Sequence, residues 1–231
     1  MKRHDLVEIS AKGREKIIKT IEEDYSANPF LQGFELDSIK VLVAMGYNGV
    51  LIPGIVRREE KEQLAGRLAI GFASPYLLDG RRLRIPAIID IEHIERTVSP
   101  YEVLERGWVP RNNCLKALKE IKKESQARGL GLGIWGSAGL EVYTGLRYTH
   151  EMSDLDLLVE QGNYDEIVEL GDVLKGISVT HGCTIDMEVS LQNGYGIKLN
   201  ELLMDTESIM GKGLKDVVLI PRQEVLKSLG K

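Results

Sequence analysis

The sequence predicts an α+β fold in two parts. A small β-rich N-terminal domain with a leading helix covers residues 1–110, and a C-terminal domain with a mixed sheet and helices covers 111–231. Runs rich in β-branched residues are concentrated before residue 92. A connector over 99–113 carries the Pro, Gly and Asn residues typical of loops. After it, helical and strand patterns alternate, so the two parts have different architectures.

The N-terminal part begins with a helical pattern over 9–26. Ser10 can cap its start, and Ile17, Ile18 and Ile21 share one face. Four strands are expected after this helix, with a turn at Asp79 before the last of them. Their ranges are 38–45, 49–56, 66–73 and 82–91.

The C-terminal part is expected to alternate helices with strands. The predicted helices are 114–127, 138–146, 163–176 with Gly176 as its stop, and a short last helix opened by Pro221. The predicted strands are 130–136, 154–160 and 184–190.

Composition limits the possible functions. Hydrophobic residues make up 43% and charged residues 28%, as in ordinary globular proteins, and the net charge of −5 disfavours a nucleic-acid partner. Cys114 and Cys183 form no CxxC pair, so we expect neither a zinc site nor a disulfide framework. No apolar run approaches the roughly 20 residues of a membrane span, and the N-terminus turns acidic too early for a signal peptide. We therefore expect a cytoplasmic protein without a membrane partner.

Two predicted strands place acidic residues on one face. In 154–160, apolar residues alternate with Asp154 and Asp156, so these two aspartates share the opposite face. In 184–190, Asp186 and Glu188 repeat the pattern. Carboxylates this close raise each other's pKa unless a cation lies between them. If the strands are neighbours, the carboxylates form a site for Mg²⁺, with Mn²⁺ as the alternative, of the kind used in phosphoryl transfer.

Gly136 and Ser137 lie between an apolar strand and a predicted helix. A helix N-terminus offers free N–H groups and partial positive charge, so it can bind phosphate. Gly136 would let the phosphate approach the backbone, and the Ser137 hydroxyl adds a donor. Taken singly, D-x-D pairs are common at solvated strand ends and Gly-Ser pairs are common in turns. Their order along this chain, followed by another acidic strand, is more specific.

This order resembles the G-S…D-x-D motif of the nucleotidyltransferase superfamily. The stretch GSAGLEVYTGLRYTHEMSDLDLLVE, residues 136–160, is similar to the form found in malonate decarboxylase holo-acyl-carrier-protein synthases, also called phosphoribosyl-dephospho-CoA transferases. The TGL.Y at 144–148 and the long gap between Ser137 and Asp154 fit that family. RHDLV, IVRR and GRLAIGF resemble its N-terminal domain. Met187 departs from the family pattern, which has glycine between the acidic residues of the third strand.

The resemblance implies a nucleotidyltransferase-type C-terminal domain and a defined reaction. The donor would be triphosphoribosyl-dephospho-CoA, the acceptor a serine of the malonate decarboxylase carrier subunit, and the by-product pyrophosphate. Asp154 and Asp156 would bind the metal and Asp186 would complete the site, with Glu188 as the alternative third carboxylate.

Three further residues are candidates for binding substrate phosphates. Arg57 and Arg58 end a predicted strand, and Lys198 follows the third acidic strand. For the two arginines, a solvated basic edge of the sheet is the more common explanation.

Two other functions stay open. The first alternative is another Mg²⁺-dependent nucleotidyltransferase that uses an ordinary nucleoside triphosphate. The second is a non-enzymatic relative that binds a nucleotide or a partner protein. The second alternative predicts degraded carboxylates, whereas Asp154, Asp156 and Asp186 are all present.

Overall fold

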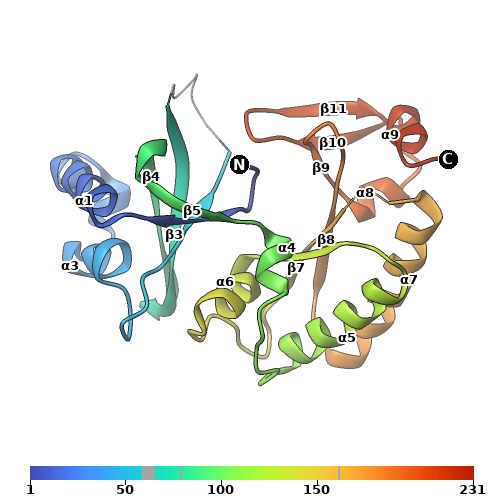
Figure 1. The fold of residues 1–231 in the computed structure, drawn as a ribbon, viewed down its shortest axis with the longest axis horizontal. Helices are drawn as coiled ribbons and strands as arrows, with labels where there is room; N and C mark the ends of the chain where they lie inside the picture. Colours follow the sequence, from blue (N-terminus) through green and yellow to red (C-terminus); the bar gives the residue numbers. More distant parts are fainter. Residues whose placement is uncertain (59–65, 79, 161) are drawn as a thin grey trace. The chain divides into compact units, whose positions relative to one another are not determined.

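The chain forms two compact units, Met1–Val98 (unit 1) and Ser99–Lys231 (unit 2), each with its own sheet (Figure 1). The structure is a computed structural model that describes residues 1–58, 66–78, 80–160 and 162–231. Two sheets combined with helices confirm the predicted α+β class. The division between the units falls just before the predicted connector and earlier than residue 110.

Unit 1 is built on a five-stranded antiparallel sheet in the order β4-β3-β2-β1-β5. Its strands are β1 (Leu6–Ile9), β2 (Gly54–Val56), β3 (Arg67–Leu78), β4 (Arg81–Asp90) and β5 (Ile94–Val98). Its helices are α1 (Ala11–Tyr25), α2 (Pro29–Gln32), α3 (Leu36–Lys40), η1 (Val41–Met45) and η2 (Ile91–His93). Ser10 caps α1 as predicted, β3 and β4 match two predicted strands, and the predicted turn residue Asp79 lies outside the described residues.

The predicted strand over 38–45 is wrong, because this segment is helical and forms the end of α3 and the π-helix η1. Its apolar side chains follow a helical spacing, since Ile39, Leu42 and Val43 are all fully buried. Burial of this helical face outweighs the preference of β-branched residues for strands. Gly46 ends the helix with a φ of 75°.

The predicted strand over 49–56 is only partly right, because sheet pairing is confined to β2. The residues before β2 form a turn in which Tyr47 and Val50 exchange two hydrogen bonds of 2.9 Å. Pro53 has no N–H to donate to a neighbouring strand, so pairing begins at the next residue.

Arg14 of α1 is a buried cation that joins three backbone segments of unit 1. Its side chain donates to the carbonyl oxygens of Ile9 at 3.2 Å, Val43 at 2.5 Å and Ile52 at 2.9 Å. Burial lowers the pKa of this guanidinium, and the charge of Glu95 acts against that shift. One side chain therefore fastens α1 to β1, η1 and the segment before β2.

Unit 2 contains a six-stranded mixed sheet in the order β11-β10-β9-β8-β7-β6. Its strands are β6 (Leu132–Trp135), β7 (Leu155–Glu160), β8 (Ile185–Ser190), β9 (Gly196–Lys198), β10 (Ser208–Lys212) and β11 (Val217–Pro221). Its helices are α4 (Pro100–Leu104), α5 (Asn113–Ala127), α6 (Gly136–Thr144), α7 (Tyr164–His181), α8 (Leu199–Leu203) and α9 (Arg222–Ser228). β7 and β8 are parallel and the other neighbours are antiparallel, which confirms the predicted mixed sheet.

Two helices of unit 2 differ from the prediction at their ends. α6 begins slightly earlier than expected, at Gly136. α7 continues past Gly176 to the left-handed C-cap Gly182, which has a φ of 60°. Leu174 and Ile177 are both buried, so the apolar face of α7 spans Gly176 and keeps it helical.

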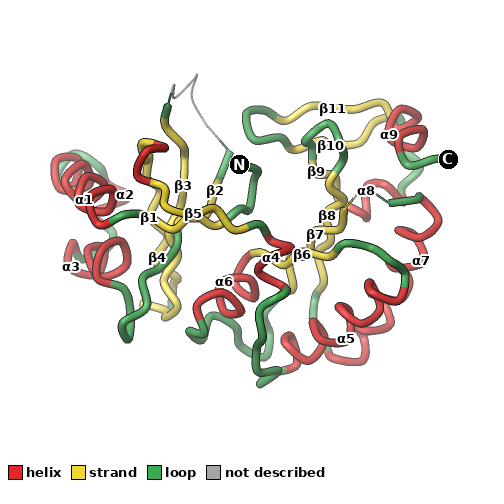
Figure 2. The backbone as a smooth tube through the Cα atoms, viewed as in Figure 1, coloured by secondary structure: helices red, strands yellow, loops and turns green. Residues whose placement is uncertain are grey.

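Helices of unit 2 lie on both sides of the sheet, and the acidic residues of β7 point away from its apolar core face. α5 and α7 pack on each other on one side of the sheet, and α6 lies on the other side (Figure 2). Leu155, Leu157 and Val159 of β7 are fully buried. Because side chains alternate along a strand, the acidic residues of β7 point to the opposite face.

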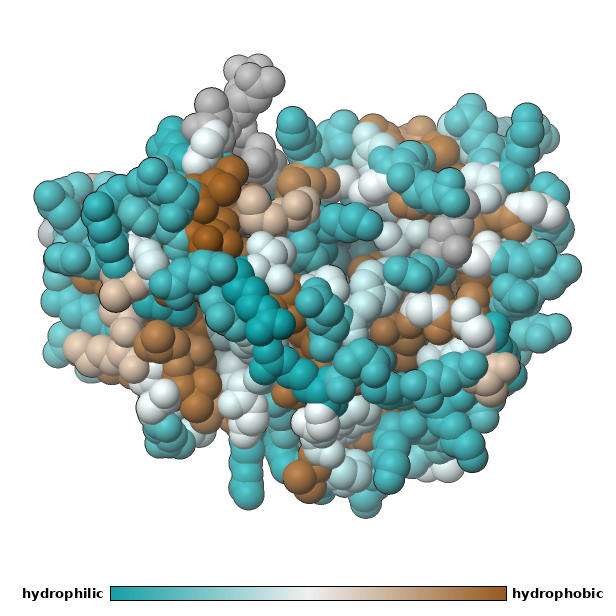
Figure 3. Space-filling view, in the orientation of Figure 1, coloured by the Kyte–Doolittle hydropathy of each residue, from teal (hydrophilic) through white to brown (hydrophobic). Residues whose placement is uncertain are grey.

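Hydrophilic side chains cover most of the surface seen in Figure 3. The most exposed large apolar residues, Val179, Met152 and Val109, lie in different segments of unit 2. Among the described residues, none of the helices has the length and apolar character that crossing a bilayer requires.

Arg14→Met should lower the free energy of unfolding of unit 1 by about 2–4 kcal/mol, because buried carbonyl groups lose their donor together. Hydrogen exchange of the backbone amides of β1 and β2 in the full chain measures this loss. Lys16→Met on the same helix is the control, since it removes only exposed ion pairs, of 3.2 Å to Asp90 and 3.9 Å to Glu92. Equal protection in both variants would contradict the role of Arg14.

Candidate active site

Four carboxylates gather where β7 and β8 run side by side. Parallel pairing places Asp156 directly opposite Asp186. Glu188 lies on the same face of β8 as Asp186, and Asp154 immediately precedes β7. The structure therefore brings together the acidic residues that the sequence pattern singled out.

The pKa of Asp156 reports how crowded this site is. Burial is the largest effect that raises the pKa of this carboxyl, from 3.8 to about 6. The charges of Asp186, Asp154 and Glu188 add to the shift, in decreasing order, and Lys198 acts against it. At neutral pH the site therefore holds more negative charge than its own cations balance.

Two lysines from neighbouring strands balance part of this charge. Lys198 of β9 lies 2.6 Å from Oδ2 of Asp186, and this hydrogen bond raises the pKa of the ammonium group. Lys212 of β10 lies 3.8 Å from Oε1 of Glu188, whose side chain is buried. Lys198 was expected to contact a substrate phosphate. In the structure it forms an ion pair with Asp186, a carboxylate of the same site.

Sequence reasoning missed Lys212. β10 reaches the site because it pairs with β9, where Lys212 lies opposite Gly196. The local sequence predicts at most a hairpin between β10 and β11. The strand order that brings this lysine to Glu188 is a property of the whole sheet.

α6 begins beside Asp156. Trp135 of β6 pairs with Asp156 across the sheet, and Gly136 follows it with a φ of 66°. A Cβ atom at Gly136 would clash with the Asp156 carboxylate, so glycine is needed for both the backbone angle and the close approach. Ser137 stands in the first turn of α6, where backbone N–H groups lack intrahelical partners. The phosphate-binding role of these residues stays a prediction.

The donor set fits a hard divalent cation. Asp154, Asp156 and Asp186 offer carboxylate oxygens, the ligands that Mg²⁺ and Mn²⁺ prefer. The raised pKa of Asp156 persists beside Lys198, so the charge of the group is incompletely balanced by this chain.

The two predicted arginines belong to the other unit. Arg57 and Arg58 directly follow β2 in unit 1. Arg57 donates its backbone N–H to the carbonyl of Ala69 at 3.1 Å, and the side chain of Arg58 is exposed. Their proposed contact with substrate phosphates stays a prediction.

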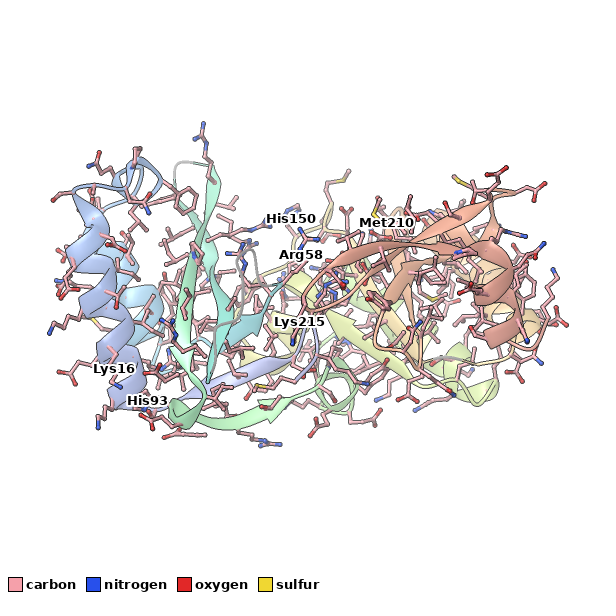
Figure 4. All side chains as sticks on the ribbon, turned by 90° about the horizontal axis from the view of Figure 1, so that it is seen from above. Lys16, Arg58, His93, His150, Met210 and Lys215 are labelled. Atoms are coloured by element: carbon pink, nitrogen blue, oxygen red, sulfur yellow. The ribbon has the colours of Figure 1, made fainter. Side chains whose placement is uncertain are left out.

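A second acidic cluster, not anticipated from the sequence, lies in unit 1. One ligand atom from each of Asp90, Glu92 and His93 lies within 4.8 Å of the others. Lys16, which Figure 4 labels, lies 3.2 Å from Asp90 and 3.9 Å from Glu92. This lysine balances the cluster, so we assign it no metal.

Asp156→Asn should make the metal-free protein more stable at pH 8 by about 1–3 kcal/mol. The folded chain holds the Asp156 proton more tightly than the unfolded chain, so ionisation destabilises the fold. This penalty is absent below about pH 4 and complete above about pH 7, on either side of the shift from 3.8 to about 6.

Denaturant unfolding in EDTA at pH 4 and pH 8, followed by the fluorescence of Trp108 and Trp135, measures this difference. Glu160→Gln, at the exposed far end of β7, is the control. An equal gain for Asp156→Asn at both pH values would show that charge is not its cause.

Gly136→Ala should lower the free energy of unfolding by about 2–4 kcal/mol, whereas Gly145→Ala should lower it by about 1 kcal/mol. Gly145 ends α6 with a φ of 73°, but its Cβ would meet nothing within 4 Å. The difference therefore measures the clash with Asp156, and it should disappear in an Asp156→Ala background. Equal losses at the two glycines would exclude the clash.

Comparison with known families covers nearly the whole chain. The family described as the phosphoribosyl-dephospho-CoA transferase MdcG N-terminal domain matches residues 2–100. The corresponding C-terminal domain matches residues 103–223, which include all four carboxylates. No solved structure matches the chain.

Curated relatives carry the same name, phosphoribosyl-dephospho-CoA transferase. The one from Pseudomonas fluorescens is 28% identical over 62% of this chain and 65% of its own length. The one from Xanthomonas euvesicatoria is 26% identical over 74% of this chain and 79% of its own length. The one from Pseudomonas putida is 30% identical over 62% and 66%, so the matches span about two thirds of the Pseudomonas relatives. Because both domains match in order along the chain, the protein belongs to the phosphoribosyl-dephospho-CoA transferase family.

Proposed function

We propose that this chain transfers the phosphoribosyl-dephospho-CoA group from triphosphoribosyl-dephospho-CoA to a serine of the malonate decarboxylase carrier subunit, with release of pyrophosphate. Family membership supports the transferred group, which the relatives carry in their name. The observation that carries the chemistry is the pairing of Asp156 opposite Asp186 beside the start of α6. Such a site suits phosphoryl transfer, in which positioning and electrostatic stabilisation supply most of the rate.

Asp154, Asp156 and Asp186 are the proposed ligands of Mg²⁺, or of Mn²⁺ in its place. The cation would offset the charge that the triphosphate carries and develops in the transition state. Asp186 is favoured over Glu188 as the third ligand because Asp186 lies directly opposite Asp156. Glu188 is only 3% exposed and already faces Lys212.

The proposed reaction exchanges one phosphate bond for another. The serine oxygen of the carrier subunit forms a bond to the phosphorus of the triphosphate that is attached to the ribose, the bond from this phosphorus to pyrophosphate breaks, and the serine proton is released to water. Gly136 and Ser137 would bind the leaving phosphates through backbone N–H groups and a hydroxyl. Lys198, which lies 2.6 Å from Oδ2 of Asp186, would be free to bind these phosphates if Asp186 held the cation.

Other features of the chain support the proposed partners and location. Arg57 and Arg58 are assigned to phosphates of the CoA part, since arginine matches phosphate geometry. The net charge of −5 supports a small-molecule donor and a protein acceptor over a nucleic acid. Both cysteines are free thiols, which supports a reducing compartment such as the cytoplasm.

A transfer assay with Mg²⁺ tests this proposal. The purified chain, triphosphoribosyl-dephospho-CoA and the apo carrier subunit should give a gain in carrier mass and one pyrophosphate per carrier. Separate replacement of Asp154, Asp156 and Asp186 by asparagine should lower the rate by about 100-fold or more. Glu160→Gln, on β7 but away from the site, should leave the rate unchanged.

ATP, CTP, GTP and UTP, tested in parallel as donors, decide the alternative. Pyrophosphate released from one of them, with an unmodified carrier, would make this chain a different nucleotidyltransferase. Full activity of the Asp156→Asn variant with normal metal dependence would overturn the assignment of Asp156 as a metal ligand.

A further inference from the structure

Glu141, in the middle of α6, fastens the loop that leads to Asp154. Its side chain is 8% exposed. Oε2 of Glu141 accepts the backbone N–H of Tyr148 at 2.9 Å and that of Thr149 at 2.7 Å. The hydroxyl of Thr149 also donates to Oε2, at 2.7 Å. The loop is therefore bound to α6 through a single carboxylate.

Arg111, which precedes α5, holds the same carboxylate from another segment. Its Nε donates to Oε1 of Glu141 at 2.6 Å, and its Nη2 donates to Oε2 at 2.9 Å. The same Nη2 also donates to the carbonyl of Thr149 at 2.5 Å. Burial alone would raise the pKa of Glu141, but the hydrogen bonds from Arg111 and Thr149 outweigh it and lower this pKa. The carboxylate is thus ionised and fully used as an acceptor.

The segment between Thr149 and Asp154 is held by hydrogen bonds within the loop. Asn112 donates to the hydroxyl of Thr149 at 2.8 Å, which fixes the direction in which that hydroxyl donates. His150 and Ser153 then exchange two hydrogen bonds, from His150 N to Ser153 Oγ at 2.9 Å and from Ser153 N to His150 O at 3.1 Å. Asp154 follows directly, so its backbone lies between this loop and β7, where Leu155 donates its N–H to the carbonyl of Thr184 at 2.8 Å.

Helix α6 thus has contacts that affect both Asp154 and Asp156. The first residue of α6, Gly136, lies against the Asp156 carboxylate. Glu141, later in the same helix, fixes the loop before Asp154. Glu141, Thr149 and Asn112 are buried, and a buried polar network in which the groups are hydrogen-bonded specifies one geometry.

We propose that Glu141 is a positioning residue that sets the Asp154 carboxylate relative to Asp156, so that the affinity for a divalent cation depends on it. This inference rests on the proposed function only in taking those carboxylates as the metal ligands. An apolar residue at position 141 would fill the space but leave the N–H groups of Tyr148 and Thr149 without their acceptor.

Mn²⁺ binding to the full chain without nucleotide, measured by electron paramagnetic resonance, tests the proposal apart from activity. Glu141→Gln keeps the size of the side chain but turns one acceptor into a donor that faces other N–H groups. We expect its Mn²⁺ affinity to fall by about 10–100-fold, as for residues that orient metal ligands. Glu124→Gln is the matched control, because it breaks a 2.6 Å ion pair with Arg128 on α5, and its Mn²⁺ affinity should equal that of the wild type.

A double variant shows whether Glu141 acts through Asp154. Asp154→Asn alone weakens Mn²⁺ binding, and adding Glu141→Gln should then change it little, because the residue to be positioned is gone. An undiminished further loss would overturn the positioning role. Thr149→Val, which keeps the backbone N–H and removes one hydroxyl, replaces Glu141→Gln if that variant does not fold, and it should fall at the lower end of the same range.

The transfer assay separates this inference from the proposed function. In the Glu141→Gln variant, kcat should fall and raised Mg²⁺ should partly restore it, which a loss of stability alone would not produce. Glu141→Gln and wild-type proteins that bind Mn²⁺ equally well would overturn the inference and leave the function standing. A wild-type protein that binds Mn²⁺ at the carboxylates but modifies no carrier would overturn the function and leave the inference standing.

Discussion

Repulsion between Asp156 and Asp186, on adjacent parallel strands, is the constraint that the rest of the site accommodates. The strands cannot separate, because the apolar side chains that alternate with these aspartates form the core between the sheet and its helices. Lys198 and Lys212 from the next two strands offset part of the negative charge, yet the pKa of Asp156 still rises to about 6. A charge imbalance retained by the packing of the core is what a cation-dependent active site needs.

Both units use an arginine to fasten backbone segments that are distant in sequence, Arg14, which is buried, in unit 1 and Arg111 in unit 2. Arg14 binds three carbonyl oxygens in unit 1, and Arg111 binds a carboxylate and a carbonyl oxygen in unit 2. The planar guanidinium has enough donors to join several segments at once, which lysine lacks. In unit 1 this joins helix to sheet, whereas in unit 2 it holds the loop that carries a proposed metal ligand.

The sequence predicted the pairing of the two acidic strands better than it predicted unit 1. The alternation of apolar and acidic residues in 154–160 and 184–190 is compatible only with strands that bury one face. The structure pairs these two strands as predicted. The segment 38–45 fits both a strand and a helix, and the contacts that bury Ile39 and Val43 on a helical face decide between them. Arg111, Glu141 and Lys212 were missed for a related reason. Their roles follow from strand order and loop path, which local pattern does not contain.

The parallel pairing of β7 with β8 also bears on the order of folding. The chain between these strands must pass through the whole of α7 before the strands can pair. Asp156 and Asp186 therefore meet only after a non-local contact has closed, and until then their repulsion is absent. If the two strands pair after the folding transition state, this repulsion acts mainly on the rate at which the native chain opens and little on the rate at which it folds. Neutralising the charge between these strands would then slow unfolding and lengthen the lifetime of the folded enzyme.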